Sequence, residues 1–158
     1  MTDRSIVRAT FTVARTFPHS AAHVFKAFSD QKAKDKWFKG PDGYQMLERT
    51  FDFRVGGEEL AIGRHGPSHG GQVSAFFALY QDIVDNERIV YTYRMTMDGA
   101  PISVSLATIE LHPDGDGTRV TITEDGVFLD GYEDGSRREH GTGWLLEQIG
   151  KSLETEAA

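Results

Sequence analysis

The chain contains no cysteine, which excludes disulfide bonds, thiolate metal ligands and a cysteine nucleophile. It also lacks any apolar run long enough to cross a bilayer. The first eight residues are polar and include Asp3, Arg4 and Arg8, so they do not resemble a secretory signal peptide. From these absences we expect a cytoplasmic protein that does not bind a membrane.

Positive charge is in deficit as well, with 17 lysines and arginines against 24 aspartates and glutamates and a formal net charge of -7. A short basic group is typical of a solvated helix face; its members are Lys32, Lys34, Lys36 and Lys39. Nucleic-acid binding requires a concentrated positive surface. We therefore expect no nucleic-acid partner.

A length of 158 residues suits one domain, which we place at residues 1–158 with a core at about 7–154. A chain of this size can bury roughly 68–70% of its unfolded surface, so it needs no covalent or metal staple. Ten phenylalanines, five tyrosines and two tryptophans are ample for a wide apolar interior.

Hydrophobic periodicity divides the chain into a strand, two short helices, a series of strands and a long last helix. Strands are expected at residues 7–17, 44–55, 58–64, 72–84, 88–97, 102–112 and 118–127. Ser20 and Asp30 are the expected N-caps of the short helices, of which the second reaches Phe38. The last helix begins at about residue 135, and its apolar stripe consists of Leu145, Leu146, Ile149 and Leu153.

This order predicts an α+β helix-grip fold, in which a curved antiparallel sheet of about six to seven strands is covered on its concave face by the last helix. Such a fold can leave a cavity between the sheet and the helix. Trp144 lies about 150° from the middle of the helix's apolar stripe. Its ring must cover a flank of the helix or meet another surface. An exposed flank is compatible with a homodimer, and equally with a buried edge.

The run from Phe51 to Gly57, Phe-Asp-Phe-Arg-Val-Gly-Gly, has the alternation of a half-buried strand that ends on a glycine turn. Asp52 and Arg54 are two residues apart and are expected on the same side of the sheet, opposite Phe53. They could hold a substrate, but a structural ion pair beside a hairpin is the favoured interpretation.

Several stretches together resemble the SRPBCC (START-related) superfamily and, within it, the AHSA-like group, the homologues of the activator of heat-shock-protein ATPase. The resemblance covers residues 7–154 and is carried by 18–25, Trp37, 52–57, 87–93, 117–124 and the pair Gly143-Trp144. It implies the helix-grip fold. It does not imply one function, because this fold serves ligand carriers, cyclases, resistance proteins and co-chaperone domains.

Aromatic side chains are the best candidates for a binding site, because they supply large apolar surface with a few polar tips. Pairs such as Tyr91 and Tyr93 share one face of their strand. The ordinary alternative is a packed core. The candidate ligand-binding residues are Trp37, Phe53, Phe76, Tyr80, Tyr91, Tyr93, Glu124 and Trp144.

Two residues are weak candidates for acid–base catalysis. Glu124 shares a strand face with Val120 and Ile122, so it would have a raised pKa if it lay in an apolar cavity. A position at the rim is the simpler alternative. His140 lies one helical turn before Trp144 and could act as an acid or base, or be a surface residue.

Metal and cofactor sites are not expected. Six histidines invite a metal hypothesis, but His65 and His69 lie in a glycine-rich turn and have no evident third ligand nearby. The phosphate-binding spacing of a glycine loop is missing around Gly56 and Gly57.

The leading functional hypothesis is a binder of a hydrophobic small molecule, such as a lipid, a polyketide or an aromatic compound. The alternative is an enzyme of the cyclase, hydrolase or isomerase type that uses a cavity carboxylate or histidine. A chaperone-interacting module with a role in stress response is a third possibility and rests on the resemblance alone.

Overall fold

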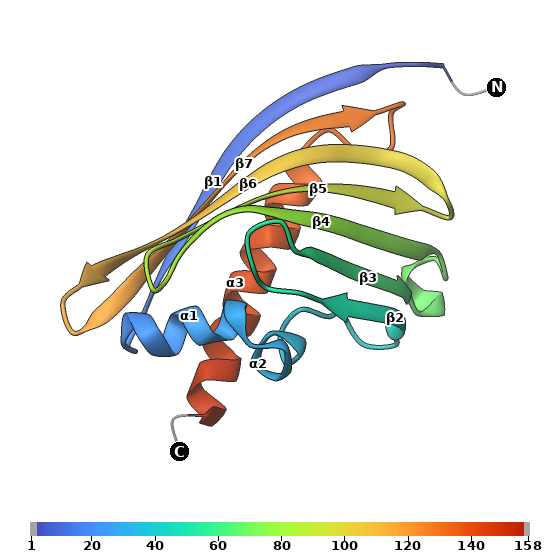
Figure 1. The fold of residues 1–158 in the computed structure, drawn as a ribbon. Coiled ribbons are helices and arrows are strands. Elements are labelled where there is room, and N and C mark those ends of the chain that lie inside the picture. The colour runs from blue at the N-terminus through green and yellow to red at the C-terminus, as the bar shows by residue number, and fades with distance from the viewer. Residues whose placement is uncertain (1–2, 157–158) are drawn as a thin grey trace.

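The computed structural model describes residues 3–156 as one curved sheet wrapped over a long helix (Figure 1). The strands are β1 (Ile6–Phe17), β2 (Gln45–Phe51), β3 (Glu58–Arg64), β4 (Val73–Val84), β5 (Arg88–Met97), β6 (Ala100–Asp114) and β7 (Gly117–Leu129). The helices are α1 (Ala21–Ser29), α2 (Gln31–Asp35) and α3 (Ser136–Glu156), with a 3-10 turn at Pro67–His69.

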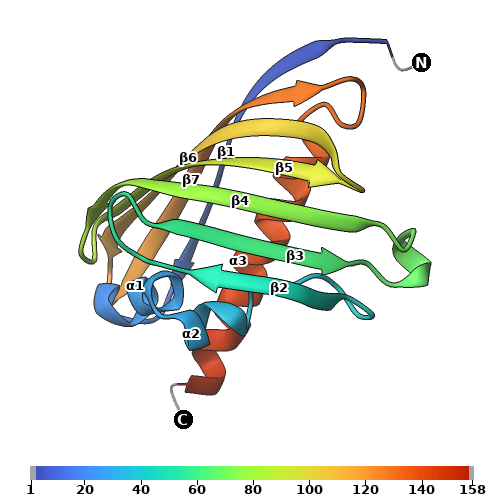
Figure 2. The same ribbon diagram turned by 45° about the vertical axis from the view of Figure 1, so that its right-hand side comes forward.

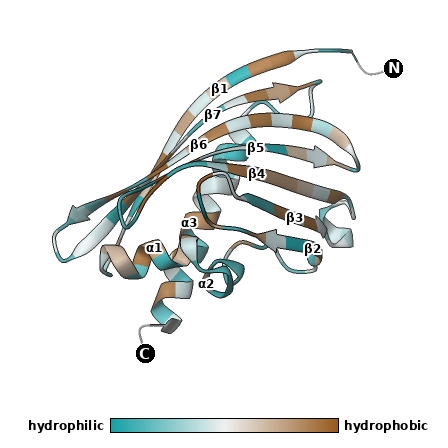
Figure 3. Ribbon diagram, in the orientation of Figure 1, coloured by the Kyte–Doolittle hydropathy of each residue, from teal (hydrophilic) through white to brown (hydrophobic). Residues whose placement is uncertain are grey.

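All neighbouring strands are antiparallel, in the order β1-β7-β6-β5-β4-β3-β2. The sheet curls so that α3 runs across its concave side, while α1 and α2 lie beside the lower part of α3 (Figures 1 and 2). The long strands carry alternating apolar and polar residues, because one face packs inward and the other meets solvent (Figure 3). The predicted α+β helix-grip architecture is confirmed.

The main core lies between the C-terminal half of α3, helix α1 and strands β1, β6 and β7. Leu146, Ile149 and Leu153 are all at most 3% exposed, and Leu145 is partly buried. This confirms the predicted apolar stripe of the last helix. Trp144, away from the stripe, keeps 38% of its surface exposed.

Both predicted helix caps are present. The Ser20 side chain accepts a hydrogen bond from the His23 amide at 3.2 Å, and the Asp30 carboxylate accepts one from the Ala33 amide at 3.0 Å. The second helix is shorter than expected: α2 ends at Asp35, so the chain reaches Phe38 through turns.

The strand expected at residues 44–55 is also shorter, because β2 ends at Phe51. Gly56 adopts φ +83°, a region that residues with a side chain rarely enter. A Cβ on Gly57 would lie 2.1 Å from the Asp52 carbonyl oxygen, so this close approach requires glycine. Val55 is 56% exposed. The alternation of apolar and polar residues therefore continues past the end of β2 into a tight turn, which is why the sequence predicted a longer strand.

Asp52 and Arg54 form an ion pair of 2.8 Å across this turn, and both side chains are more than half exposed. Phe53 lies inside and stacks on Phe51, with 5.9 Å between ring centroids. This geometry matches the structural interpretation of the pair.

One member of the basic group lies in the interior. Lys34 is only 4% exposed, so its predicted place on a solvated helix face is wrong. Its Nζ donates to Oε1 of Glu59 at 2.7 Å, and Nη1 of Arg49 donates to Oε2 at 2.7 Å. The Tyr80 hydroxyl donates to Oε1 at 2.5 Å, and Arg49 also pairs with Asp35. These bonds connect α2 to β2, β3 and β4.

The two cations decide the charge of Glu59. Burial alone would raise the pKa of this carboxyl, but the charge of Lys34 and its hydrogen bond outweigh burial, and the net pKa is lowered. Glu59 is therefore an ionised carboxylate, and its hydrogen-bond and ion-pair partners are side chains of the protein. Burial lowers the pKa of Lys34, and the Glu59 charge opposes that effect.

We expect Glu59→Gln to destabilise the fold by about 3–5 kcal/mol at pH 7, because removing one partner leaves buried charges uncompensated. Urea unfolding followed by circular dichroism measures this. The matched control is Asp52→Asn, which breaks an exposed pair and should change stability by less than about 1 kcal/mol. Equal effects of the two substitutions would contradict the assignment.

Candidate functional site

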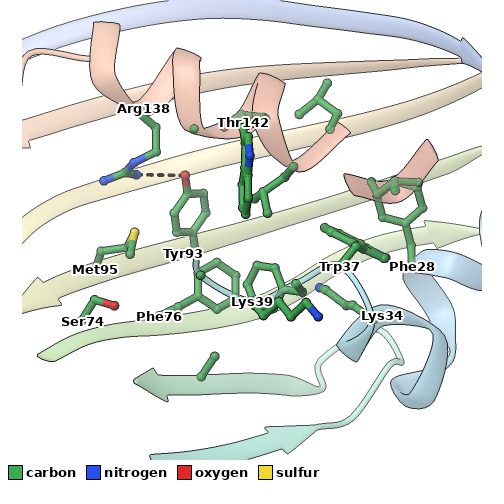
Figure 4. Close-up of a pocket in the computed structure, with 18 of the residues that line it drawn as sticks. Phe28, Lys34, Trp37, Lys39, Ser74, Phe76, Tyr93, Met95, Arg138 and Thr142 are labelled. Carbon is green, nitrogen blue, oxygen red and sulfur yellow. Dashed lines mark hydrogen bonds between the residues drawn. The ribbon is translucent and has the colours of Figure 1, made fainter. Parts of the chain in front are cut away.

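A cavity of about 320 Å³ lies between the concave face of the sheet and the N-terminal half of α3 (Figure 4). Its wall is largely apolar. The polar side chains on the wall are Lys34, Lys39, Tyr44, His65, Ser74, Tyr91, Tyr93, Glu124, Arg138 and Thr142. The apolar side chains are Phe28, Trp37, Phe38, Met46, Ala61, Phe76, Met95, Ile109, Ile122, Trp144, Leu145 and Ile149.

Aromatic rings from β4 and β5 form the floor. Tyr91 and Tyr93 share the concave face because they are two residues apart on β5. Ala78 is the direct partner of Tyr93, which places Phe76 on the diagonal, with 5.0 Å between the centroids of the Phe76 and Tyr93 rings. Phe38 meets Phe76 edge-on at 5.0 Å. The floor is thus a continuous aromatic surface.

Trp37 closes the cavity near α1 and α2. Its indole Nε1 donates to the Ala27 carbonyl at 2.8 Å, and its ring packs edge-on against Phe28 at 5.4 Å. Because the polar edge of the indole is satisfied inside the protein, the ring presents apolar surface to the cavity.

A polar cluster lies where α3 crosses β5 and β7. Glu124 is only 5% exposed, so it is a buried group and not a residue of the rim. It accepts hydrogen bonds from the Tyr93 hydroxyl and, at 2.9 Å, from Oγ1 of Thr142. Nη1 of Arg138 donates to the Tyr93 hydroxyl at 2.9 Å (Figure 4), and Nη2 pairs with Glu133 at 2.8 Å.

Burial raises the pKa of Glu124, although the hydrogen bonds from Tyr93 and Thr142 and the charge of Arg138 oppose it. The pKa of Tyr93 is raised by burial and by the neighbouring Glu124. Tyr93 therefore stays a hydroxyl donor near neutral pH. Glu124 has the environment of a carboxyl group that can hold or release a proton inside an apolar site.

A second polar group lies at the other end of the cavity. Nε2 of His65 and Oγ of Ser74 are 3.0 Å apart, and the Tyr44 ring packs edge-on against His65 at 5.2 Å. A Cβ on Gly63 would lie 2.0 Å from the Tyr44 hydroxyl, so this ring fits only over a glycine. Burial lowers the pKa of His65, which favours the neutral imidazole.

Of the predicted site residues, the structure brings six to the cavity: Trp37, Phe76, Tyr91, Tyr93, Glu124 and Trp144. Phe53 and Tyr80 lie in the adjacent core, with 5.0 Å between their ring centroids, and Tyr80 is 2% exposed. His140 is exposed and does not line the cavity. Ligand binding by the six remains a prediction.

Sequence reasoning missed several cavity residues. The signal for Arg138 and Thr142 was available, because they lie four residues apart on α3 and continue to Leu145 and Ile149 at helical spacing. Lys34 could not be found in this way, because nothing local distinguishes it from the exposed lysines beside it.

Metal binding and membrane insertion are two further classes of site to consider. Within residues 3–156, no group of three or more histidine, aspartate or glutamate side chains is arranged to hold a metal ion. No helix in the same part of the chain is both long and apolar enough to cross a membrane.

The raised pKa of Glu124 predicts a pH-dependent effect of Glu124→Gln. Above about 4.5, the ordinary value, the unfolded chain loses this proton while the native protein still holds it. The stability that Glu124 contributes is therefore complete below that pH and is lost as pH rises through the folded-state pKa. Glutamine stays neutral, so the stability of the variant relative to the wild type should increase as pH rises from 4.5. Urea unfolding across pH 4–8 measures this, and a flat difference would contradict it.

Solved structures show which proteins the chain resembles. A protein from Rhizobium loti shares 44% identity with a TM-score of 0.84, over 94% of this chain and 99% of that one. A protein from Rhizobium leguminosarum shares 38% identity with a TM-score of 0.90, over 98% of this chain and 99% of that one. An AHSA1-like protein from Aeromonas hydrophila, 14% identical over 94% of each chain, is similar in fold with a TM-score of 0.71.

A comparison with curated proteins finds no match. The family model described as Activator of Hsp90 ATPase homolog 1-like protein matches residues 18–155, which is most of the chain. This match agrees with the curved sheet, the two short helices and the covering α3. The chain therefore belongs to the Activator of Hsp90 ATPase homolog 1-like protein family.

Proposed function

We propose that this protein binds a hydrophobic small molecule in the cavity under α3. The observation that carries the proposal is the cavity of about 320 Å³, whose floor of packed aromatic rings has polar clusters at its ends. Mostly apolar walls with a few placed polar groups are typical of small-molecule sites. The family has a fold that commonly binds hydrophobic ligands.

The volume favours a compact ligand. Small-molecule sites range over roughly 300–1,000 Å³, and this cavity is at the lower end. Among the classes that the sequence suggests, a one- or two-ring aromatic compound fits better than a lipid or an extended polyketide. Flat rings can stack on Phe76 and Tyr93, while the Glu124 cluster orients the polar edge of the ligand.

Filling the cavity should block binding without disrupting the fold. Ala61 is on the wall beside Phe76, so Ala61→Phe places a ring in the space that a ligand would occupy. We expect affinity for an aromatic ligand to fall about tenfold or more. A thermal-shift screen of aromatic compounds supplies the ligand, and titration of tryptophan fluorescence measures the affinity.

Leu79→Phe is the matched control for this experiment, because Leu79 is on β4 but exposed and away from the cavity. It should leave the affinity unchanged. Equal binding by the Ala61 variant and the wild type would show that the ligand sits elsewhere.

A second candidate function is acid–base catalysis on the bound compound, and one observation favours it. Glu124 is buried, has a raised pKa and lies on the cavity wall, as a general acid or base requires. Such a group typically contributes about 10²–10⁴ in rate. If a ligand is converted, Glu124→Gln should reduce turnover by at least about a hundredfold while binding persists, as measured by mass spectrometry of the product and by titration.

A role with a chaperone is suggested only by the description of the family, which names an activator of the Hsp90 ATPase. For this chain it remains a prediction. The measurement is the ATPase rate of the chaperone with an excess of this protein, and an unchanged rate would count against the role.

A further inference from the structure

We infer that the cavity selects a neutral aromatic compound that carries an oxygen acceptor, and that the Tyr91 hydroxyl donates the hydrogen bond that recognises this oxygen. The inference rests on the proposed function, because it names the ligand class of the same cavity. It rests on a difference in hydrogen bonding among the three tyrosines on the concave face of β4 and β5, which are Tyr80, Tyr91 and Tyr93.

Two of these hydroxyls already have acceptors. The Tyr80 hydroxyl donates to Glu59, and the Tyr93 hydroxyl donates to Glu124. Tyr91 lies between them, with its ring 5.7 Å from that of Tyr80 and 5.8 Å from that of Tyr93. Its hydroxyl has no hydrogen-bond partner among residues 3–156, although the residue lines the cavity. A ligand oxygen would supply that partner.

The surroundings of Tyr91 keep it a donor. Burial raises its pKa well above the ordinary value, and the charges of Glu124 and Glu59 act in the same direction. The group is therefore an O–H at any physiological pH. A ligand atom opposite this O–H must accept, as a carbonyl or ether oxygen does.

The charge balance of the wall argues for a neutral ligand. Lys34 is paired with Glu59, and Arg138 is paired with Glu133, so these interior cations are already compensated. A carboxylate on the ligand would approach Glu124 after losing its own water shell, which is costly without a dedicated partner. Lys39 also lines the cavity, but its side chain is exposed and its charge is solvated.

Three ligands of one shape separate these contributions. Indane supplies the apolar rings, 1-indanone adds a carbonyl acceptor, and indane-1-carboxylate adds a charge. A neutral hydrogen bond of this kind is worth about three- to tenfold in affinity. We expect 1-indanone to bind the wild-type protein more tightly than indane by that factor, and the carboxylate to bind most weakly.

Tyr91→Phe removes the hydroxyl and keeps the ring. In this variant the preference for 1-indanone over indane should fall to about one, while the affinity for indane is retained. The matched control is Tyr132→Phe, which removes a hydroxyl from a tyrosine that is exposed and outside the cavity, and should leave the preference intact. Isothermal titration calorimetry measures all affinities, and circular dichroism checks the fold of each variant.

The infrared carbonyl band of bound 1-indanone gives a test that needs no variant. A hydrogen bond from Tyr91 should shift this band to lower frequency than in an apolar solvent, and the shift should disappear in Tyr91→Phe. An unshifted band in the wild-type complex would overturn the inference even if the variant did not fold.

The outcomes separate the two proposals. If indane and 1-indanone both bind with equal affinity, or if the carboxylate binds most tightly, the inference is overturned and the proposed function stands. If Tyr91→Phe keeps the full preference, the donor is not Tyr91 and the inference is overturned. If none of the three ligands binds, both proposals fail for ligands of this size.

Discussion

A carboxylate taken out of water must find its partners within the protein, and the cavity is organised around two such groups. Glu59 is 1% exposed and binds Lys34, Arg49 and Tyr80, which ties α2 to three strands of the sheet. The turn after α2 then carries Trp37 into the wall of the cavity. Glu124 on β7 likewise accepts a hydrogen bond from Thr142, which connects this strand to the first half of α3.

The cavity and the core are two halves of the same interface. The C-terminal half of α3 buries Leu146, Ile149 and Leu153 against the sheet and α1. The N-terminal half presents Arg138 and Thr142 instead, whose polar heads reach the strands through hydrogen bonds. At this end the helix lines the cavity with Arg138, Gly141, Thr142 and Trp144, and the space between the helix and the floor stays open. The composition of one helix thus decides where the protein is packed and where it is hollow.

Much of the fold and part of the site could be predicted, because both depend on local patterns. Parity along β5 placed Tyr91 and Tyr93 on one face, and the caps at Ser20 and Asp30 are formed as expected. Local patterns failed to predict burial where it depends on a partner that is distant in the sequence. Lys34 resembles the exposed lysines around it, and only the arrival of Glu59 from β3 makes its burial possible.

The sequence by itself determined the order of elements, the antiparallel pairing and the aromatic face, because these follow from periodicity and short turns. The tertiary structure alone decided which aromatics face a cavity and which fill the core. Phe53 and Tyr80 pack against each other in the interior, whereas Phe76 and Tyr91 border open space. Tyr80, Tyr91 and Tyr93 look equivalent in sequence, and only the curvature of the sheet brings carboxylates to the hydroxyls of Tyr80 and Tyr93 and places Tyr91 on the cavity wall without one.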